Sequence, residues 1–133
     1  MSELNINASQ ILGKTSASIL HLKGQLDRNT ADQFLDRARQ AHEDGARYLL
    51  VDLSDVGMLT SSGLLAIQSI FKLFTPEGDT AIIRHHQDEP YKSPYFKLVC
   101  PNPQIYYVLN IAGFLHNIPI YNNLDEAVAS FAD

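Results

Sequence analysis

Three adjacent hydroxyl groups, Thr60, Ser61 and Ser62, precede a glycine at the start of an amphipathic segment. Apolar residues recur behind them at helical spacing, at Leu64, Ile67, Phe71 and Phe74. The hydroxyls therefore fall in the first turn of a predicted helix, where free N–H groups and a partial positive charge lie. A hydroxyl there can cap the helix, which is the commoner use, or it can carry a phosphate that the helix end stabilises.

A predicted strand and loop position these hydroxyls. The run from Tyr48 to Leu53 is short, apolar and rich in Leu and Val, which is typical of a strand buried on both faces. Ser54 to Gly57 is polar and is predicted to be a loop. The candidate site thus follows a buried strand and opens the next helix.

The residue pattern gives little support for catalysis or for metal binding. A nucleophilic serine needs a base, and none of the five histidines lies in a recognisable acid–base motif. The segment His85 to Glu89 lacks the spacing of zinc ligands and is predicted to be a solvated polar loop. Asp52 and Asp55 are interpreted as turn residues. We therefore predict no catalytic residue, no metal site and no cofactor.

The rest of the chain alternates between strands and helices. Strands are predicted at Glu3–Leu12, Ser16–Leu26, Tyr48–Leu53, Thr80–Arg84, Tyr95–Cys100 and Ile118–Tyr121. Gly13-Lys14 is a predicted hairpin turn, and His85 to Pro94 a predicted loop. Helices are predicted to begin at Thr30, Thr60, Asn102 and Asn123, the first through a capping box of Thr30 and Gln33. This order predicts an α/β fold with a mixed central sheet and about four packed helices.

Composition restricts the class of protein. With 133 residues, the chain is expected to form one domain, residues 1–133. The net charge is −5 and Lys and Arg are not clustered, which argues against nucleic acid as a partner. No apolar run is long enough to span a membrane, and the N-terminus has no signal-peptide pattern. Cys100 is the single cysteine, so we expect a reducing, cytoplasmic location.

Several segments together resemble the STAS domain family of anti-sigma-factor antagonists. Asp52 to Val56 and Thr60 to Leu64 are similar to the family signature, in which Asp-Leu-Ser ends a strand and Asp-Ser-Ser-Gly-Leu starts the next helix. Leu22 to Asp27 is similar to the family's Gly-x-Leu-Asp segment. Further matches at Pro101–Pro103 and Leu124–Ala127 extend the likeness in order along the chain.

The resemblance implies a non-enzymatic signalling protein that works by partner switching. The unmodified protein would bind a serine kinase that is also an anti-sigma factor, and phosphorylation would release it until a phosphatase resets the cycle. Ser61 matches the phosphorylated serine, Gly63 the motif glycine, and Asp27 an acidic residue near the site. Asp27, Thr60, Ser62 and Gly63 are accordingly expected at the partner-binding surface.

Two departures from the family pattern favour an alternative. Thr60 stands where the family usually has Asp, and it could itself be a second acceptor. Residues 80–95 form an apparent insertion between the second helix and the next strand. The alternative is an unphosphorylated scaffold or ligand-binding module in a larger signalling complex. Whether the chain forms a homodimer stays open.

Overall fold

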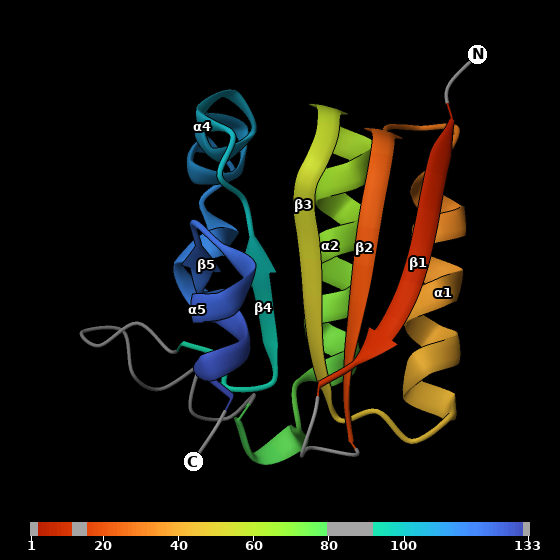
Figure 1. The fold of residues 1–133 in the computed structure, drawn as a ribbon, viewed down its shortest axis with the longest axis vertical. Coiled ribbons are helices and arrows are strands. Elements are labelled where there is room, and N and C mark those ends of the chain that lie inside the picture. Colours follow the sequence, from red (N-terminus) through yellow and green to blue (C-terminus); the bar gives the residue numbers. More distant parts are fainter. Residues whose placement is uncertain (1–2, 12–15, 80–91, 132–133) are drawn as a thin grey trace.

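The computed structural model describes residues 3–11, 16–79 and 92–131, and these form a mixed α/β fold (Figure 1). The strands are β1 Leu4–Gln10, β2 Ala17–Leu26, β3 Tyr48–Leu59, β4 Phe96–Val99 and β5 Ile120–Tyr121. The helices are α1 Ala31–Glu43, α2 Ser61–Phe74, α4 Pro103–Ile111 and α5 Leu124–Ala129, with a short 3₁₀ turn at Phe114–Asn117. The predicted fold class is confirmed.

The five strands lie side by side in the order β1-β2-β3-β4-β5. β1 is antiparallel to β2, and every other neighbouring pair is parallel. β2 and β3 end together, because Leu26 pairs with Leu59 at the last position of both strands. The carboxyl ends of β2 and β3 therefore lie side by side at one end of the sheet, where α1 and α2 begin.

Helices cover the two faces of the sheet unequally. α1, α2 and α4 pack on one face, over the main core that includes Phe34, Ile67 and Leu109. α5 packs on the other face, where Ala127 and Phe131 contact a smaller apolar cluster. In Figure 1, α1 and α2 lie behind β1–β3, and no described helix lies in front of these strands. Beyond that smaller cluster, which includes residues of β2 and β3, the same face of β1–β3 is consequently open.

A buried lysine fixes the end of α5. Lys97 in β4 is 6% exposed, and its ammonium donates to the backbone oxygen of Ser130 at 3.1 Å and to the Ser130 hydroxyl at 2.9 Å. The same ammonium lies 4.3 Å from the centre of the Phe131 ring. Burial of this charge is tolerated because several groups surround it, including the carbonyl end of a helix.

The predicted loop at Ser54–Gly57 is wrong, because β3 continues through these residues to Leu59. The strand remains paired with β2 by two shifts of register, between His21 and Lys23 and between Gly24 and Gln25. Such irregularities let strands of uneven spacing remain hydrogen-bonded. Polar composition indicated a turn here, whereas tertiary pairing keeps the backbone extended.

The predicted capping box at Thr30 and Gln33 is also wrong. Thr30 is the N-cap of α1 by position, but its side chain makes no capping bond. Its hydroxyl donates to the Gln25 carbonyl at 2.8 Å, and the Gln33 amide donates to the Leu4 carbonyl at 2.9 Å. Both side chains satisfy carbonyls elsewhere in the fold, including one in the edge strand β1.

Several predictions lie outside the described residues. They are the Gly13-Lys14 turn, the Thr80–Arg84 strand and most of the 80–95 insertion. Within the described part of the chain, no helix is long and apolar enough to cross a membrane.

Candidate functional site

The predicted hydroxyl cluster lies where β3 passes directly into α2. β3 ends at Leu59, Thr60 is the N-cap in extended conformation, and Ser61 is the first residue of the helix. The Thr60 amide donates to the Leu26 carbonyl at 3.1 Å. This bond ties the start of α2 to the end of β2, so the hydroxyls are held beside the β2–α1 turn.

Gly63 lets α2 approach β2 this closely. An added Cβ at this position would lie 2.7 Å from Leu59 Cδ1 and 2.8 Å from the Leu26 carbonyl oxygen. Gly63 is itself buried, with ordinary backbone angles. The motif glycine therefore has a packing role here, which is to seat the first turn of the helix against the ends of two strands.

The three hydroxyls occupy different environments. Ser61 is exposed and Ser62 is half-buried. The Thr60 hydroxyl oxygen is buried, and it makes no hydrogen bond to any described residue. The capping interpretation is thus right about the position of Thr60 and wrong about its side chain. Of these three groups, Ser61 offers the most accessible oxygen for modification.

Asp27 lies in the turn that adjoins this helix start. This residue is 8% exposed, and its carboxylate accepts a hydrogen bond from the Asn29 amide at 2.9 Å. Its carbonyl accepts from the Ala31 amide at 2.8 Å, and its own amide donates to the Thr30 hydroxyl at 3.0 Å. Asp27 is therefore part of the turn framework, one residue after the Leu26 carbonyl that holds α2.

Exposed apolar side chains flank the hydroxyls. Met58, near the end of β3, is 44% exposed, and Leu65 on α2 is 62% exposed. Ser61 and Leu65 are four residues apart, so they lie on the same face of the helix. Lys72 is the single charged residue of α2. A helix with a single charged residue, and with an exposed apolar side chain beside an accessible hydroxyl, is suited to contact with another protein.

A polar network that sequence reasoning missed lies on the open face of the sheet. His21 bonds to Ser9 and to Asp52, which are 12 and 31 residues away along the chain. Each of the three residues comes from a different strand, so the cluster corresponds to no local sequence motif. The sequence shows no histidine in a recognisable acid–base motif, and His21 meets its two partners only because the three strands are neighbours in the sheet. Asp55, by contrast, is exposed on β3.

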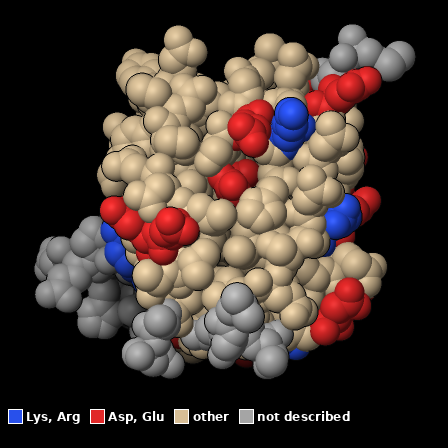
Figure 2. All heavy atoms as spheres, in the orientation of Figure 1, with Lys and Arg blue, Asp and Glu red and all other residues tan. Residues whose placement is uncertain are grey.

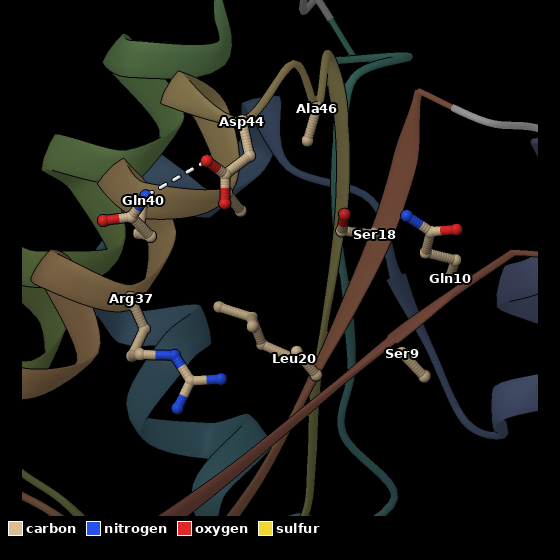
Figure 3. A pocket seen from close by; sticks show the side chains of 10 residues that line it. Ser9, Gln10, Ser18, Leu20, Arg37, Gln40, Asp44 and Ala46 are labelled. Carbon is tan, nitrogen blue, oxygen red and sulfur yellow. Dashed lines mark hydrogen bonds between the residues drawn. The ribbon is translucent and has the colours of Figure 1, made fainter.

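A hollow of about 340 Å³ lies at the opposite end of β2, between α1 and the first two strands (Figure 3). Leu20 and Arg37 face it, whereas the Ser9 side chain lies away from them across β1. The Arg37 guanidinium donates to the Ile6 carbonyl at 3.3 Å, and Gln40 donates to Asp44 at 3.1 Å. The polar groups here serve the edge strand and the helix, and the hollow is remote from Ser61.

Solved structures of similar fold include three that are described in related terms. An anti-sigma factor antagonist from Mycobacterium paratuberculosis is 20% identical, with 98% of this chain and 96% of that chain covered and a TM-score of 0.77. An anti-sigma-factor antagonist (STAS) domain protein from Planctomyces limnophilus is 16% identical, with 96% and 97% covered and a TM-score of 0.67. The Bacillus cell fate determinant SpoIIAA in its phosphorylated form is 12% identical, with 96% and 97% covered and a TM-score of 0.58.

At these identities the likeness shows a shared fold. A search of curated proteins found no significant match. The model of the STAS domain family matches residues 8–93, which include β2, α1, β3, α2 and the hydroxyl cluster. This match spans more than half of the sequence. The likeness in fold to the Mycobacterium paratuberculosis structure extends over 98% of the chain. The chain belongs to the STAS domain family.

Proposed function

We propose that this chain is a cytoplasmic signalling protein of the anti-sigma-factor antagonist type, controlled by phosphorylation of Ser61. In its unmodified form it binds a protein partner, a serine kinase that also acts as an anti-sigma factor. Phosphate on Ser61 releases the partner, and a phosphatase restores the binding form. The chain contributes a binding surface and an acceptor hydroxyl, and it has no catalytic role in this cycle.

The observation that carries the proposal is the exposure of Ser61 at the first position of α2, beside exposed Met58 and Leu65. In the proposed complex, Ser61, Ser62 and the two apolar side chains contact the partner. Asp27, Thr60 and Gly63 shape the same surface, because Asp27 orders the β2–α1 turn, whereas Thr60 and Gly63 hold the first turn of α2 against the end of β2.

Charge provides the mechanism of release. A phosphate adds about −1.5 to −2 charge at neutral pH. In the free protein the N-terminus of α2 favours that charge by ~0.3–1 kcal/mol, so the fold is unaffected. In an interface that fits a neutral hydroxyl, desolvation and like-charge contacts cost several kcal/mol. At 1.4 kcal/mol per tenfold change, the loss of affinity is roughly a hundredfold or more.

The experiment begins with phosphopeptide mapping of the protein purified from its native cells. Phosphate on Ser61 is the expected result. Partners are then captured from the same cells with wild-type protein, Ser61→Ala and Ser61→Asp, and we expect Ser61→Asp alone to lose the kinase-type partner. Gln104→Glu is the matched control, because it adds one negative charge to the first turn of α4, on an exposed residue.

Two results would overturn the proposal. One is a motif that stays unmodified through growth and stress, and the other is equal partner capture by Ser61→Asp and Gln104→Glu. Either result would favour the alternative, a constitutive scaffold or ligand-binding STAS module. The substitution of Thr60 for the family's usual Asp is the feature that favours that alternative.

A further inference from the structure

A hydrogen-bonded chain of three side chains crosses the open face of the sheet. The Ser9 hydroxyl on β1 lies 3.1 Å from Nε2 of His21 on β2. Nδ1 of His21 lies 3.1 Å from Oδ2 of Asp52 on β3. The sheet therefore brings together a hydroxyl, an imidazole and a carboxylate in the order that activates a serine nucleophile.

Asp52 is fixed and ionised, so it can orient the imidazole. Its second oxygen, Oδ1, accepts bonds from both the amide and the hydroxyl of Ser54. Burial acts to raise the pKa of the Asp52 carboxyl, but the bonds from Ser54 and His21 outweigh it and hold the pKa below its ordinary value. An ionised Asp52 accepts a hydrogen bond from Nδ1–H, which leaves the lone pair of Nε2 directed at the Ser9 hydroxyl.

The nucleophile end of the network is accessible. Ser9 is exposed, while the side chains of His21 and Asp52 are 33% and 15% exposed. Figure 2 shows this face of the molecule toward the viewer, with mostly uncharged side chains and a few charged ones. Asn7 pairs directly with His21 across β1 and β2, so a side-chain amide rises from the same face. Such an amide is a suitable donor to the oxygen of a carbonyl under attack.

We propose that Ser9 is an acyl-acceptor site, activated by His21 and Asp52 and independent of Ser61. In the reaction, Ser9 Oγ forms a bond to the carbonyl carbon of an activated acyl ester or thioester. His21 Nε2 takes the hydroxyl proton, the bond to the alcohol or thiol leaving group breaks, and the imidazolium returns the proton to that group. The products are an acyl-serine at position 9 and a free alcohol or thiol.

The test uses the whole chain with p-nitrophenyl acetate as the acyl donor and site-resolved mass spectrometry of each serine. We expect Ser9 to be acetylated about 100-fold faster than Ser61 or Ser69, the low end of what a positioned base contributes. Ser61 and Ser69 on α2 are exposed and have no hydrogen bond to a described histidine, so the wild-type protein contains its own controls.

Variants separate activation from simple exposure. His21→Asn replaces the imidazole with an amide, which can form hydrogen bonds but cannot act as a base, and Asp52→Asn removes the carboxylate that orients the imidazole. Both are expected to reduce Ser9 acetylation to the rate of Ser69, with an unfolding midpoint that shows a retained fold. Acetylation of Ser9 at the rate of Ser69 in the wild-type protein would overturn the proposal. Equal Ser9 rates in the wild type and a folded His21→Asn variant would do so too.

Discussion

Substitution of Gly63 by alanine tests how α2 is held at the candidate site. The new methyl group would lie 2.7 Å from Leu59 Cδ1, 2.8 Å from the Leu26 carbonyl oxygen and 2.9 Å from Leu26 Cγ. The Leu59 methyl is the end of a side chain and can move. The Leu26 carbonyl cannot easily move, because it belongs to β2 and accepts a hydrogen bond from the Thr60 amide at 3.1 Å. The first turn of the helix must therefore shift outward.

Two opposing effects set the change in the free energy of unfolding that Gly63→Ala should cause. Overpacking of this kind costs about 1–3 kcal/mol. Alanine is the better helix former by up to about 1 kcal/mol, which offsets part of that cost. We expect Gly63→Ala to lower the free energy of unfolding by about 1–2 kcal/mol, a factor of roughly 5–30 in the folding equilibrium.

Urea unfolding, followed by circular dichroism, measures this change through the midpoint and the slope. Gly57→Ala is the matched control, since a Cβ at Gly57 meets nothing within 4 Å and its φ is not positive. That variant should be as stable as the wild type or slightly more so. Equal midpoints for Gly63→Ala and Gly57→Ala would refute the packing argument, and with it our account of how the hydroxyls are positioned.

Three further predictions concern stability. Thr60→Val should leave the free energy of unfolding unchanged or raise it by up to about 1 kcal/mol in urea unfolding, because the Thr60 hydroxyl is buried and bonds to no described residue; a loss of about 1 kcal/mol, as for a functioning cap, would contradict this. Lys97→Ala should cost about 2–4 kcal/mol and increase hydrogen exchange in α5, with Lys97→Met less damaging because it retains the buried stem; equal costs would argue against a packing role for the stem. Asp52 has a folded-state pKa below its ordinary value of 3.8, so it stabilises the fold above that value, and the contribution disappears as pH falls through the lowered pKa. Unfolding midpoints at pH 7 and pH 2 should therefore differ less for Asp52→Asn than for the wild type, and an identical acid sensitivity would exclude this role.

Sequence periodicity was sufficient for most elements of the fold. The apolar faces of α1, α2 and α4 follow helical spacing, and Asn102 and Asn123 cap their helices through side-chain bonds to Gln104 and Glu126, near where the sequence predicts these helices to begin. These features depend on residues within a turn or two of each other, so local pattern carries the information. The hydroxyl cluster could be found in the same way, because all three residues are consecutive at a helix start.

Pairing between distant segments decided the features of the fold that local sequence patterns predicted wrongly. Ser54–Gly57 has the composition of a loop, yet its backbone bonds to β2 and extends β3. Thr30 and Gln33 have the spacing of a capping box, yet they bond to Gln25 and Leu4 instead. Local propensity is weaker than the need to satisfy buried or edge backbone groups, and that need depends on which strands are neighbours.

The sequence by itself determined the class of fold, the position of the three hydroxyls and the low charge of the helix that they open. Only the tertiary structure decided that Ser61 is open while the Thr60 oxygen is buried, because that difference depends on how α2 meets the end of β2. It also decided that Ser9, His21 and Asp52 meet, since the strand order β1-β2-β3 and the register of each pair place three separated residues on one face.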